Sequence, residues 1–444
     1  MKYLIIVPDG AADISVENEK TPLEAAYMPT INGLARRSRT GLVRTIPRGI
    51  TPGSDAANLA VLGYDPRTEL TGRSPLEVVS MGIDLGERDV SFRANLVTLK
   101  EAGEAGEAGA AGDAGYSGDV GGYENLLIID HASGDISDEE ASALISVIDA
   151  ELGSGDPKNE GRVCFYPGVS YRNALIVRDG AVTKNGIGDV FADYPNYALV
   201  PPHDILGRVI DLYLPDKGNE KYILDLMKKS YVLLKDHEVN KARIERGLRP
   251  ANSIWIWGEG RRPLLSPITE KYGVEGAVIS AVDLIKGIGI CAGLEPIKVE
   301  GATGTITTNF RGKGDAAISA FVRGKDLAYV HIEAPDECAH QGSRADKITA
   351  LERIDSDIVA PILAWLEKNR SETGEEFRIL IVPDHRTPVV IRTHTDEPVP
   401  YVIYDSKAAE TCVEDGRRAF TERAAEAGEP VHSGKELADV FFCA

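Results

Sequence analysis

The sequence predicts an α/β fold with a mostly parallel sheet flanked by helices, together with a smaller inserted α+β domain. At both ends of the chain, short apolar runs that suit strands alternate with helical patterns, which is typical of parallel sheets. The middle of the chain differs, because it holds several short strand-like runs bounded by turns and one helical pattern. A length of 444 residues suggests two or three domains and allows a large buried core.

The alternation of strands and helices begins with an apolar strand at 4–8. The other elements expected in the N-terminal part are a helix at 22–37, an apolar run at 41–46, and helices at 54–62 and 74–82. From residue 266 the alternation returns, with a helix at 277–293, a strand at 327–333, a helix at 346–369, strands at 378–383 and 400–404, and a helix at 434–442.

The middle region is expected to fold as a separate α+β insert. Its elements are strands at 90–99, 125–130, 163–166 and 173–177 and a helix at 137–152. We therefore place the inserted domain at 86–264 and a discontinuous core at 1–85 and 265–444. A tract of Gly, Ala and Glu at 101–115 has no large apolar side chain to bury, so we expect 101–122 to be an exposed, flexible loop without a chemical role.

The charge and cysteine content exclude several classes of function. With 49 basic and 69 acidic residues, the formal net charge is −20, which argues against binding to nucleic acid or to an anionic membrane. The five cysteines are scattered and form no CxxC pair, so neither a disulfide framework nor a zinc ribbon is indicated. The first apolar run is too short for a signal peptide, and the longest apolar stretch carries charges, so we expect a cytoplasmic protein.

Three predicted strands end in the same way, with a proline followed by an aspartate. These aspartates are Asp9, Asp336 and Asp384. Ligands bind at the carboxyl ends of the strands in open parallel sheets, so the three carboxylates are expected at one edge. Carboxylates held together there would repel one another and carry raised pKa values unless a cation neutralised them.

Histidines cluster beside the same strand ends. His340 follows Asp336 by four residues, His385 follows Asp384 directly, and His394 lies nine residues further on. Mixed carboxylate and imidazole ligands suit Mn²⁺, Zn²⁺ or Fe²⁺. For any one of these residues, a helix cap or a satisfied histidine is the simpler interpretation. The joint pattern favours a metal site.

Ser54 is the candidate nucleophile. It lies where the loop 51–53 enters the predicted helix 54–62, and free N–H groups at a helix start favour an anion such as phosphate. A serine hydroxyl becomes a good nucleophile toward phosphorus when a divalent metal binds it. Without the metal ligands, a plain helix cap would be the better interpretation of this serine.

Ten short motifs resemble those of one known family. They are VPDG at 7–10, PGSDAAN at 52–58, LGYDP at 62–66, TGRSPLE at 71–77, YPGVSYR at 166–172, PPHD at 201–204, WGEG at 257–260, KGIG at 286–289, EAPDE at 333–337 and PDH at 383–385. Through nearly the whole chain, the sequence resembles the cofactor-independent phosphoglycerate mutases of the archaeal type, within the alkaline phosphatase superfamily.

The resemblance implies an alkaline-phosphatase-like core and a phosphotransferase that uses two divalent metal ions. One ion would be bound by Asp9, Ser54, Asp384 and His385, and the other by Asp336, His340 and His394. Mn²⁺ is the ion the family suggests, with Zn²⁺ and Mg²⁺ as alternatives. Ser54 would take the phosphoryl group from 3-phosphoglycerate as phosphoserine and pass it to the 2-hydroxyl of glycerate.

The resemblance also implies how the substrate is held. The inserted domain would close over it and exclude water, since phosphoserine would otherwise be hydrolysed. Arg172 and Lys286 are the first candidates for binding the phosphate and carboxylate groups, and Arg93 and Arg261 are weaker ones. For each of the arginines, a solvated salt bridge is the alternative.

Asp135 departs from the archaeal pattern, in which an arginine commonly stands. An anion in place of a cation would change what a phosphate site binds. In this respect the chain resembles a bacterial subgroup proposed to act as homoserine kinases in threonine synthesis, which is the alternative activity. A P-loop kinase is excluded, because the sequence holds no Walker A motif.

Two further alternatives use the same residues. One is a metal-dependent phosphatase or phosphonate hydrolase, and the other is a noncatalytic metal-binding or structural protein. The expected partner is a small phosphorylated substrate, with neither nucleic acid nor membrane, and the sequence carries no signal for an oligomeric state.

Overall fold

The computed structural model describes residues 1–16, 19–101, 122–180, 199–215 and 221–443. The chain forms two compact units, of which unit 1 comprises Met1–Leu70 and Pro263–Ala444 and unit 2 comprises Thr71–Arg262. Unit 2 is therefore inserted into unit 1. The predicted loop 101–122 lies outside the described residues except for its two ends.

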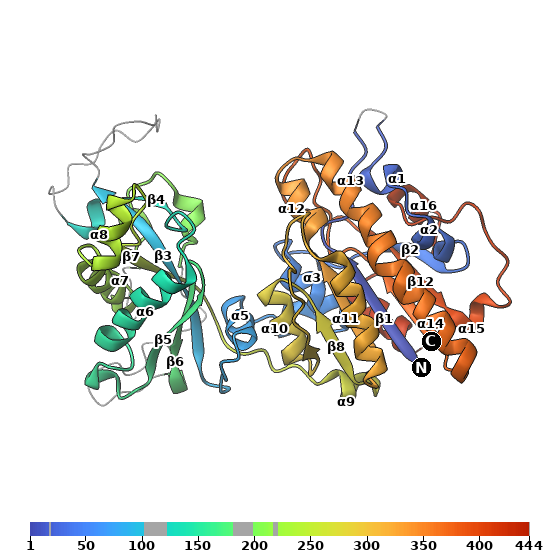
Figure 1. Cartoon of the computed structure of the whole chain (residues 1–444), viewed down its shortest axis with the longest axis horizontal. Helices are drawn as coiled ribbons and strands as arrows, with labels where there is room; N and C mark the ends of the chain where they lie inside the picture. The colour runs from blue at the N-terminus through green and yellow to red at the C-terminus, as the bar shows by residue number, and fades with distance from the viewer. Residues whose placement is uncertain (17–18, 102–121, 181–198, 216–220, 444) are drawn as a thin grey trace. The chain divides into compact units, whose positions relative to one another are not determined.

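Unit 1 is built on a seven-stranded sheet, shown with its helices in Figure 1. The strands are β1 (Lys2–Pro8), β2 (Arg39–Val43), β8 (Gly276–Ile279), β9 (Glu295–Pro296), β10 (Leu327–Ile332), β11 (Phe377–Ile381) and β12 (Val399–Asp405). Their order is β2-β12-β11-β1-β10-β8-β9. Only the β11–β12 and β12–β2 pairs are antiparallel, so among the described residues the prediction of a mostly parallel sheet is confirmed.

Strand β1 lies in the middle of this sheet because its side chains are apolar on both faces. It pairs in parallel with β10 on one side and with β11 on the other. Residues 4–7 have no exposed surface, as expected for a parallel strand that is covered on both faces. The carboxyl ends of β11, β1 and β10 are consequently neighbours at one edge of the sheet.

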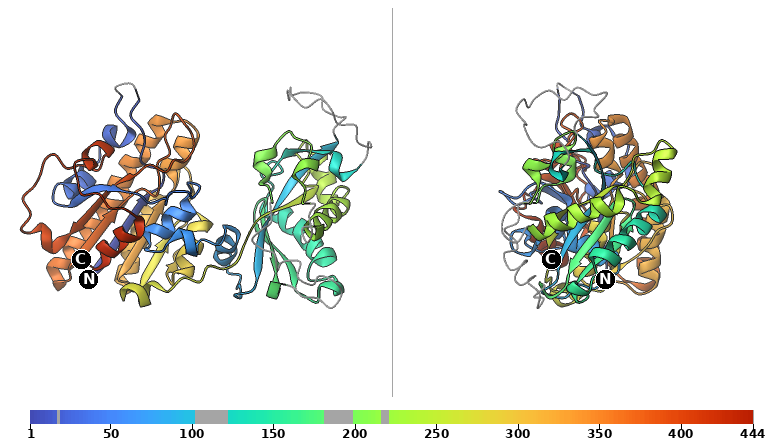
Figure 2. Two further views of the ribbon diagram at one scale, coloured as in Figure 1. Left: turned by 180° about the vertical axis from the view of Figure 1, so that it is seen from behind. Right: turned by 90° about the vertical axis from the view of Figure 1, so that its left-hand side faces the viewer.

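Helices cover both faces of the sheet. They are α1 (Pro22–Ala25), α2 (Pro29–Ala35), α3 (Ser54–Val61), α4 (Pro66–Glu69), α9 (Ile268–Tyr272), α10 (Asp283–Cys291), α11 (Phe310–Val322), α12 (Ala334–His340), α13 (Arg344–Arg353), a π-helical turn (Ile354–Val359), α14 (Ala360–Thr373), α15 (Ser406–Ala409), α16 (Glu422–Ala425) and α17 (Gly434–Cys443). Helix α11 packs on β8, β10 and α14, whereas α10 and α17 both pack on α3. Figure 2 shows unit 1 from behind, with α17 in red.

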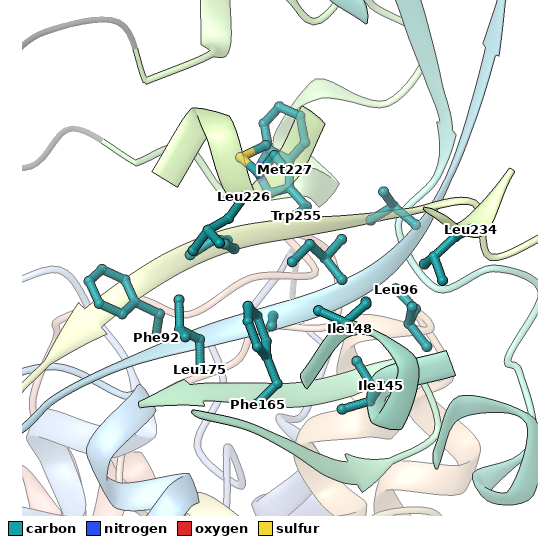
Figure 3. Packing of buried hydrophobic residues seen from close by; sticks show 14 of the residues in the cluster. Phe92, Leu96, Ile145, Ile148, Phe165, Leu175, Leu226, Met227, Leu234 and Trp255 are labelled. Carbon is teal, nitrogen blue, oxygen red and sulfur yellow. The ribbon is translucent and has the colours of Figure 1, made fainter. Parts of the chain in front are cut away.

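Unit 2 is an α+β unit around one long strand. Its strands are β3 (Val90–Glu101), β4 (Leu126–Asp130), β5 (Val163–Val169), β6 (Arg172–Val177) and β7 (Ser253–Gly260), and its helices are α5 (Ser74–Ser80), α6 (Asp138–Leu152), α7 (Lys221–Leu234) and α8 (Glu238–Glu245). Strand β3 pairs in antiparallel fashion with β4, β6 and β7. Buried side chains such as Phe92, Leu96 and Trp255 form the core of the unit (Figure 3).

Helix α5 belongs to the inserted unit, because it packs on β3 and β7. The sequence places the insert at 86–264, whereas in the structure the division falls after Leu70 and after Arg262. A helical pattern shows which face of a helix is apolar but does not say which sheet that face covers.

Three helices predicted as continuous are divided in the structure. The predicted helix 277–293 is wrong at its start, because residues 277–279 lie in β8 and pair with β10, and a short apolar run suits either element. The predicted helix 22–37 is interrupted before Pro29, since the residue that precedes a proline disfavours the helical conformation. The predicted helix 346–369 is divided into α13 and α14 by the π-helical turn. Several elements were not predicted from the sequence, among them β7, α7, α8 and α11.

Candidate metal centre and nucleophile

Three neighbouring strands bring the candidate carboxylates to one edge of the sheet in unit 1. Asp9 directly follows β1, Asp384 lies three residues after β11, and Asp336 lies in the first turn of α12, which follows β10. All three are buried. The recurrence of Pro-Asp at strand ends thus corresponds to spatial proximity, because these strands are adjacent in the sheet.

Two groups of side chains share His385. In one group, ligand atoms of Asp9, Asp384 and His385 all lie within 4.8 Å of one another. In the other, ligand atoms of Asp336, His385 and His394 are equally close. His385 Nε2 lies 3.6 Å from Asp9 Oδ1 and 3.4 Å from Asp384 Oδ2, so this nitrogen faces both carboxylates of the first group.

His340 joins the second group from the last turn of α12. Its Nε2 lies 3.1 Å from Asp336 Oδ2 and 3.0 Å from His394 Nε2. Its Nδ1 lies 2.9 Å from the Arg392 carbonyl oxygen, which fixes the ring. A hydrogen bond with the Asp336 carboxylate raises the pKa of His340 to about 9. The structure thus brings together the six aspartates and histidines that the sequence and the resemblance name for metal binding.

The residues of the first group fit a divalent cation. Asp9 Oδ1 is buried without a hydrogen-bond partner among the described residues. Burial, followed by the charges of Asp384 and Asp336, raises the pKa of Asp9 well above its usual range. A cation would stabilise these carboxylates in their charged form, and the mixed oxygen and nitrogen donors suit Mn²⁺ or Zn²⁺.

Ser54 opens helix α3 and points its hydroxyl at the shared histidine. Its Oγ lies 3.1 Å from His385 Nε2. Asn58, one turn further along α3, donates to the Ser54 carbonyl oxygen at 2.8 Å and to Asp384 Oδ2 at 3.1 Å. Tyr329 of β10 in turn donates to Asn58 Oδ1, so a buried chain of hydrogen bonds ties the start of α3 to the sheet.

Thr387 connects the two metal groups and settles which nitrogen of His385 carries a proton. Its Oγ1 donates to Asp336 Oδ1 at 2.5 Å and lies 3.1 Å from His385 Nδ1. Because the hydroxyl has one proton, and that proton goes to Asp336, Thr387 must accept a hydrogen from His385 Nδ1. The lone pair of His385 is then on Nε2, the nitrogen that faces Ser54 and the carboxylates.

Gly10 lies between the carboxylates of Asp384 and Asp336 and leaves room for both of them. Its φ is +59°, a left-handed conformation that glycine adopts readily, and its N–H donates to Asp384 Oδ1 at 3.0 Å. A Cβ at this position would lie 2.5 Å from Asp336 Oδ1 and 2.5 Å from Thr387 Oγ1. Both the conformation and the space therefore require glycine here.

Three residues of this centre were not predicted from the sequence: His331, Asn58 and Thr387. His331 is fully buried in β10, with Nε2 3.1 Å from Asp9 Oδ2, and burial lowers its pKa to about 3. Asn58 could have been found from the helical spacing, since it lies four residues after Ser54 on the same face. For the hydroxyl of Thr387 the sequence offers no signal apart from its closeness to Asp384.

The candidate substrate cations are distributed over both units. Lys286, in α10 of unit 1, pairs with Asp283 at 2.6 Å. In unit 2, Arg93 pairs with Glu77 and lies over the Trp257 ring, 4.5 Å from its centroid.

Two further candidates lie in unit 2. Arg172 is exposed at the start of β6, with its guanidinium 4.7 Å from the centroid of the Tyr171 ring. Arg261 is half-buried next to the end of β7, and its carbonyl oxygen accepts a hydrogen bond from Thr71.

Comparisons with known proteins agree with one another. Residues 35–240 match the family model described as 2,3-bisphosphoglycerate-independent phosphoglycerate mutase. The chain is 43% identical over 432 residues to the 2,3-bisphosphoglycerate-independent phosphoglycerate mutase of Methanosarcina barkeri, covering 96% of each chain. It is 42% identical over 445 residues to a probable enzyme of the same name from Geobacter sulfurreducens, covering 100% of each.

Solved structures show the same fold. A protein from Pyrococcus horikoshii aligns over 99% of this chain and 96% of its own, with a TM-score of 0.73 and 25% identity. The cofactor-independent phosphoglycerate mutase of Thermoplasma acidophilum aligns over 99% and 98%, with a TM-score of 0.60 and 23% identity. None of the helices in the described part of the chain combines the length and apolar character that crossing a membrane requires.

Proposed function

The chain belongs to the family of 2,3-bisphosphoglycerate-independent phosphoglycerate mutases, and we propose on this basis that it interconverts 3-phosphoglycerate and 2-phosphoglycerate with Ser54 as the nucleophile. The observation that carries the proposal is the position of Ser54 Oγ, 3.1 Å from the Nε2 of the histidine shared by the two metal groups. A hydroxyl held there is next to the residues that would bind the metals.

We assign one divalent ion to Asp9, Ser54, Asp384 and His385 and the other to Asp336, His340 and His394, with Mn²⁺ as the first candidate. When bound, the two ions would supply positive charge at the attacking and leaving oxygens of phosphoryl transfer. The buried, unpartnered Asp9 Oδ1 and the raised pKa of Asp9 support a cation in the first group.

The reaction consists of two transfers through one serine. Ser54 Oγ forms a bond to phosphorus while the bond from phosphorus to the C3 oxygen of the substrate breaks, and the serine proton ends on that oxygen. Glycerate then presents its 2-hydroxyl, whose oxygen takes the phosphoryl group while its proton returns to Ser54. Protons and phosphoryl groups balance over the cycle, as an isomerisation requires.

We assign the binding of the substrate's anionic groups first to Arg172 and Lys286 and second to Arg93 and Arg261. Arg172 comes first because its side chain is exposed and, among the described residues, contacts the Tyr171 ring but pairs with no carboxylate. Arg93 comes second because it already donates hydrogen bonds to Glu77 through both Nε and Nη2.

Two parallel assays test the proposed function. Purified protein with Mn²⁺ is incubated with 3-phosphoglycerate, and formation of 2-phosphoglycerate is followed. A second sample receives ATP and homoserine, because the resemblance implies an arginine at the position of Asp135, which is exposed in the loop after β4, and an anion there would change what a phosphate site binds. O-phosphohomoserine without mutase turnover would overturn the proposal in favour of a kinase, and steady release of inorganic phosphate would favour a phosphatase.

The Ser54→Ala variant separates catalysis from metal binding. We expect turnover to fall by roughly a thousandfold or more, since the nucleophile is lost, while bound metal is retained through the carboxylates and histidines. Metal content and phosphoserine are measured on the same samples. Mutase turnover that survives in Ser54→Ala would rule out the serine mechanism.

A further inference from the structure

A cavity lined by both apolar and basic side chains lies in unit 1, and its lining includes none of the seven candidate metal ligands. Its volume is about 430 Å³. The walls come from the segment after β2, the C-terminal end of α3, the start of α4 and the start of α17. A volume of this size is within the usual range for pockets that bind small molecules.

The lining of this cavity is strongly basic in an acidic chain. Arg44, Arg48, Arg67 and Lys435 line it, against the single carboxylate of Asp65. The chain as a whole carries a formal charge of −20, and in this cavity three of the four cations are paired with carboxylates, so Arg48 supplies the excess positive charge. Clefts lined by charge of one sign attract small ions of the opposite sign.

Arg48 is the cation that is free for a ligand. It is exposed, and it makes no hydrogen bond or ion pair with any residue that the structure describes. Arginine guanidinium groups bind phosphate through two parallel hydrogen bonds, which makes an unpaired arginine in a basic pocket a phosphate-binding group.

The other three cations are held in position by single acidic partners. Arg44 lies 3.3 Å from Asp396 and Arg67 lies 2.8 Å from Asp65, while Lys435 pairs with Asp439. The side chain of Arg67 is 65% exposed and donates to Asp65 through Nε at 3.0 Å and Nη2 at 2.8 Å, so this exposed pair contributes little stability and Nη1 remains as a donor for a ligand. Such pairs orient the basic groups without neutralising the whole cavity.

The cavity is connected to the candidate nucleophile through helix α3. Ala60, near the C-terminal end of α3, lines the cavity, whereas Ser54 begins the same helix. A Cβ at Gly434 would lie 2.7 Å from the Ala60 Cβ, so the start of α17 abuts α3. Thr45, also in the lining, donates its hydroxyl to the carbonyl oxygen of Asp384.

We propose that this cavity binds a small phosphorylated anion, at a site separate from the metal centre and at the opposite end of the helix that carries Ser54. The inference rests on the cavity and its basic lining and goes beyond the proposed mutase reaction. Arg48 and Arg67 bind the phosphoryl group, and Arg44 and Lys435 supply additional positive charge.

Residue-specific protection by inorganic phosphate tests the proposal. The metal-loaded protein is treated with the arginine reagent phenylglyoxal, with phosphate or with sodium chloride of equal ionic strength, and each modified arginine is quantified by peptide mass spectrometry. Arg311 of α11 is the matched control, because its side chain is 63% exposed and paired with Asp315, much as Arg67 is 65% exposed and paired with Asp65.

We expect phosphate to slow modification of Arg48 and Arg67 by roughly tenfold at ten times its Kd, as mass action requires, and to leave Arg311 unchanged. In the Arg48→Ala variant, protection of Arg67 should need roughly tenfold more phosphate. Equal slowing of Arg67 and Arg311, or undiminished protection in Arg48→Ala, would overturn the proposal. Protection that persists in Ser54→Ala would show that this site does not depend on the proposed mutase reaction.

Discussion

The position of Thr387 between the two metal groups leads to a quantitative prediction. Thr387→Val keeps the shape of the side chain but removes the hydroxyl that donates to Asp336 Oδ1 and accepts from His385 Nδ1. A hydrogen bond to a charged group contributes about 1.5–3 kcal/mol, and here a buried carboxylate and an imidazole N–H would both lose a partner. We therefore expect metal affinity to fall by about 10- to 150-fold.

The assay is calorimetric titration of the metal-free protein with Mn²⁺, combined with the turnover of 3-phosphoglycerate. Thr387→Ser should recover most of the affinity because it restores the hydroxyl. Thr349→Val is a surface control, since its hydroxyl is exposed and donates only to the Ala345 carbonyl oxygen. Wild-type Mn²⁺ affinity and turnover in Thr387→Val, within about twofold, would refute the assignment of the His385 proton to Nδ1.

Three further predictions concern the centre and its substrate. Gly10→Ala should lose bound metal and about 1–2 kcal/mol of unfolding free energy. Gly273 is the control, because it has a φ of +72° and a Cβ there would meet nothing within 4 Å, so Gly273→Ala should lose only the unfolding free energy that the left-handed backbone costs. Metal analysis and denaturant unfolding distinguish the two variants. Burial and the neighbouring carboxylates raise the pKa of Asp9 in the folded protein, so its stabilising contribution is present at low pH and is lost as the pH rises. The difference in melting temperature between metal-loaded and chelator-treated protein should therefore widen as the pH rises above the usual range of an aspartate, and a constant difference would contradict this. Arg172→Ala should raise the KM for 3-phosphoglycerate by about 10- to 100-fold without loss of metal. Arg88 is an exposed arginine of the same unit that pairs with Asp179, and Arg88→Ala should leave the KM unchanged.

The sequence predicted the parts of the fold that follow from local patterns. Apolar runs that end in Pro-Asp identified β1, β10 and β11 and the edge at which their aspartates meet. The same reasoning failed at 277–279, where a buried run reads equally well as helix or strand, and only pairing with β10 decides the outcome.

The candidate site shows a similar limit. Carboxylate and imidazole side chains could be selected by residue type, which is how Asp9, Asp336 and His385 were found. Thr387 and His331 could not, because their roles depend on distances between segments that are far apart in the chain. Likewise, the basic cavity combines residues 44–67 with residues 432–435, and no local pattern brings these together.

The insertion of unit 2 between Leu70 and Pro263 has a consequence for biosynthesis. Asp9 and Ser54 leave the ribosome before the inserted unit, whereas Asp336, Asp384 and His394 leave after it. At about 5–20 residues per second, roughly 20–70 s separate the translation of Ser54 from that of His394. Unit 2 can fold during that interval, but the residues that we propose as metal ligands are not all present until translation is almost finished, so the proposed cation site would be among the last parts of the protein to form.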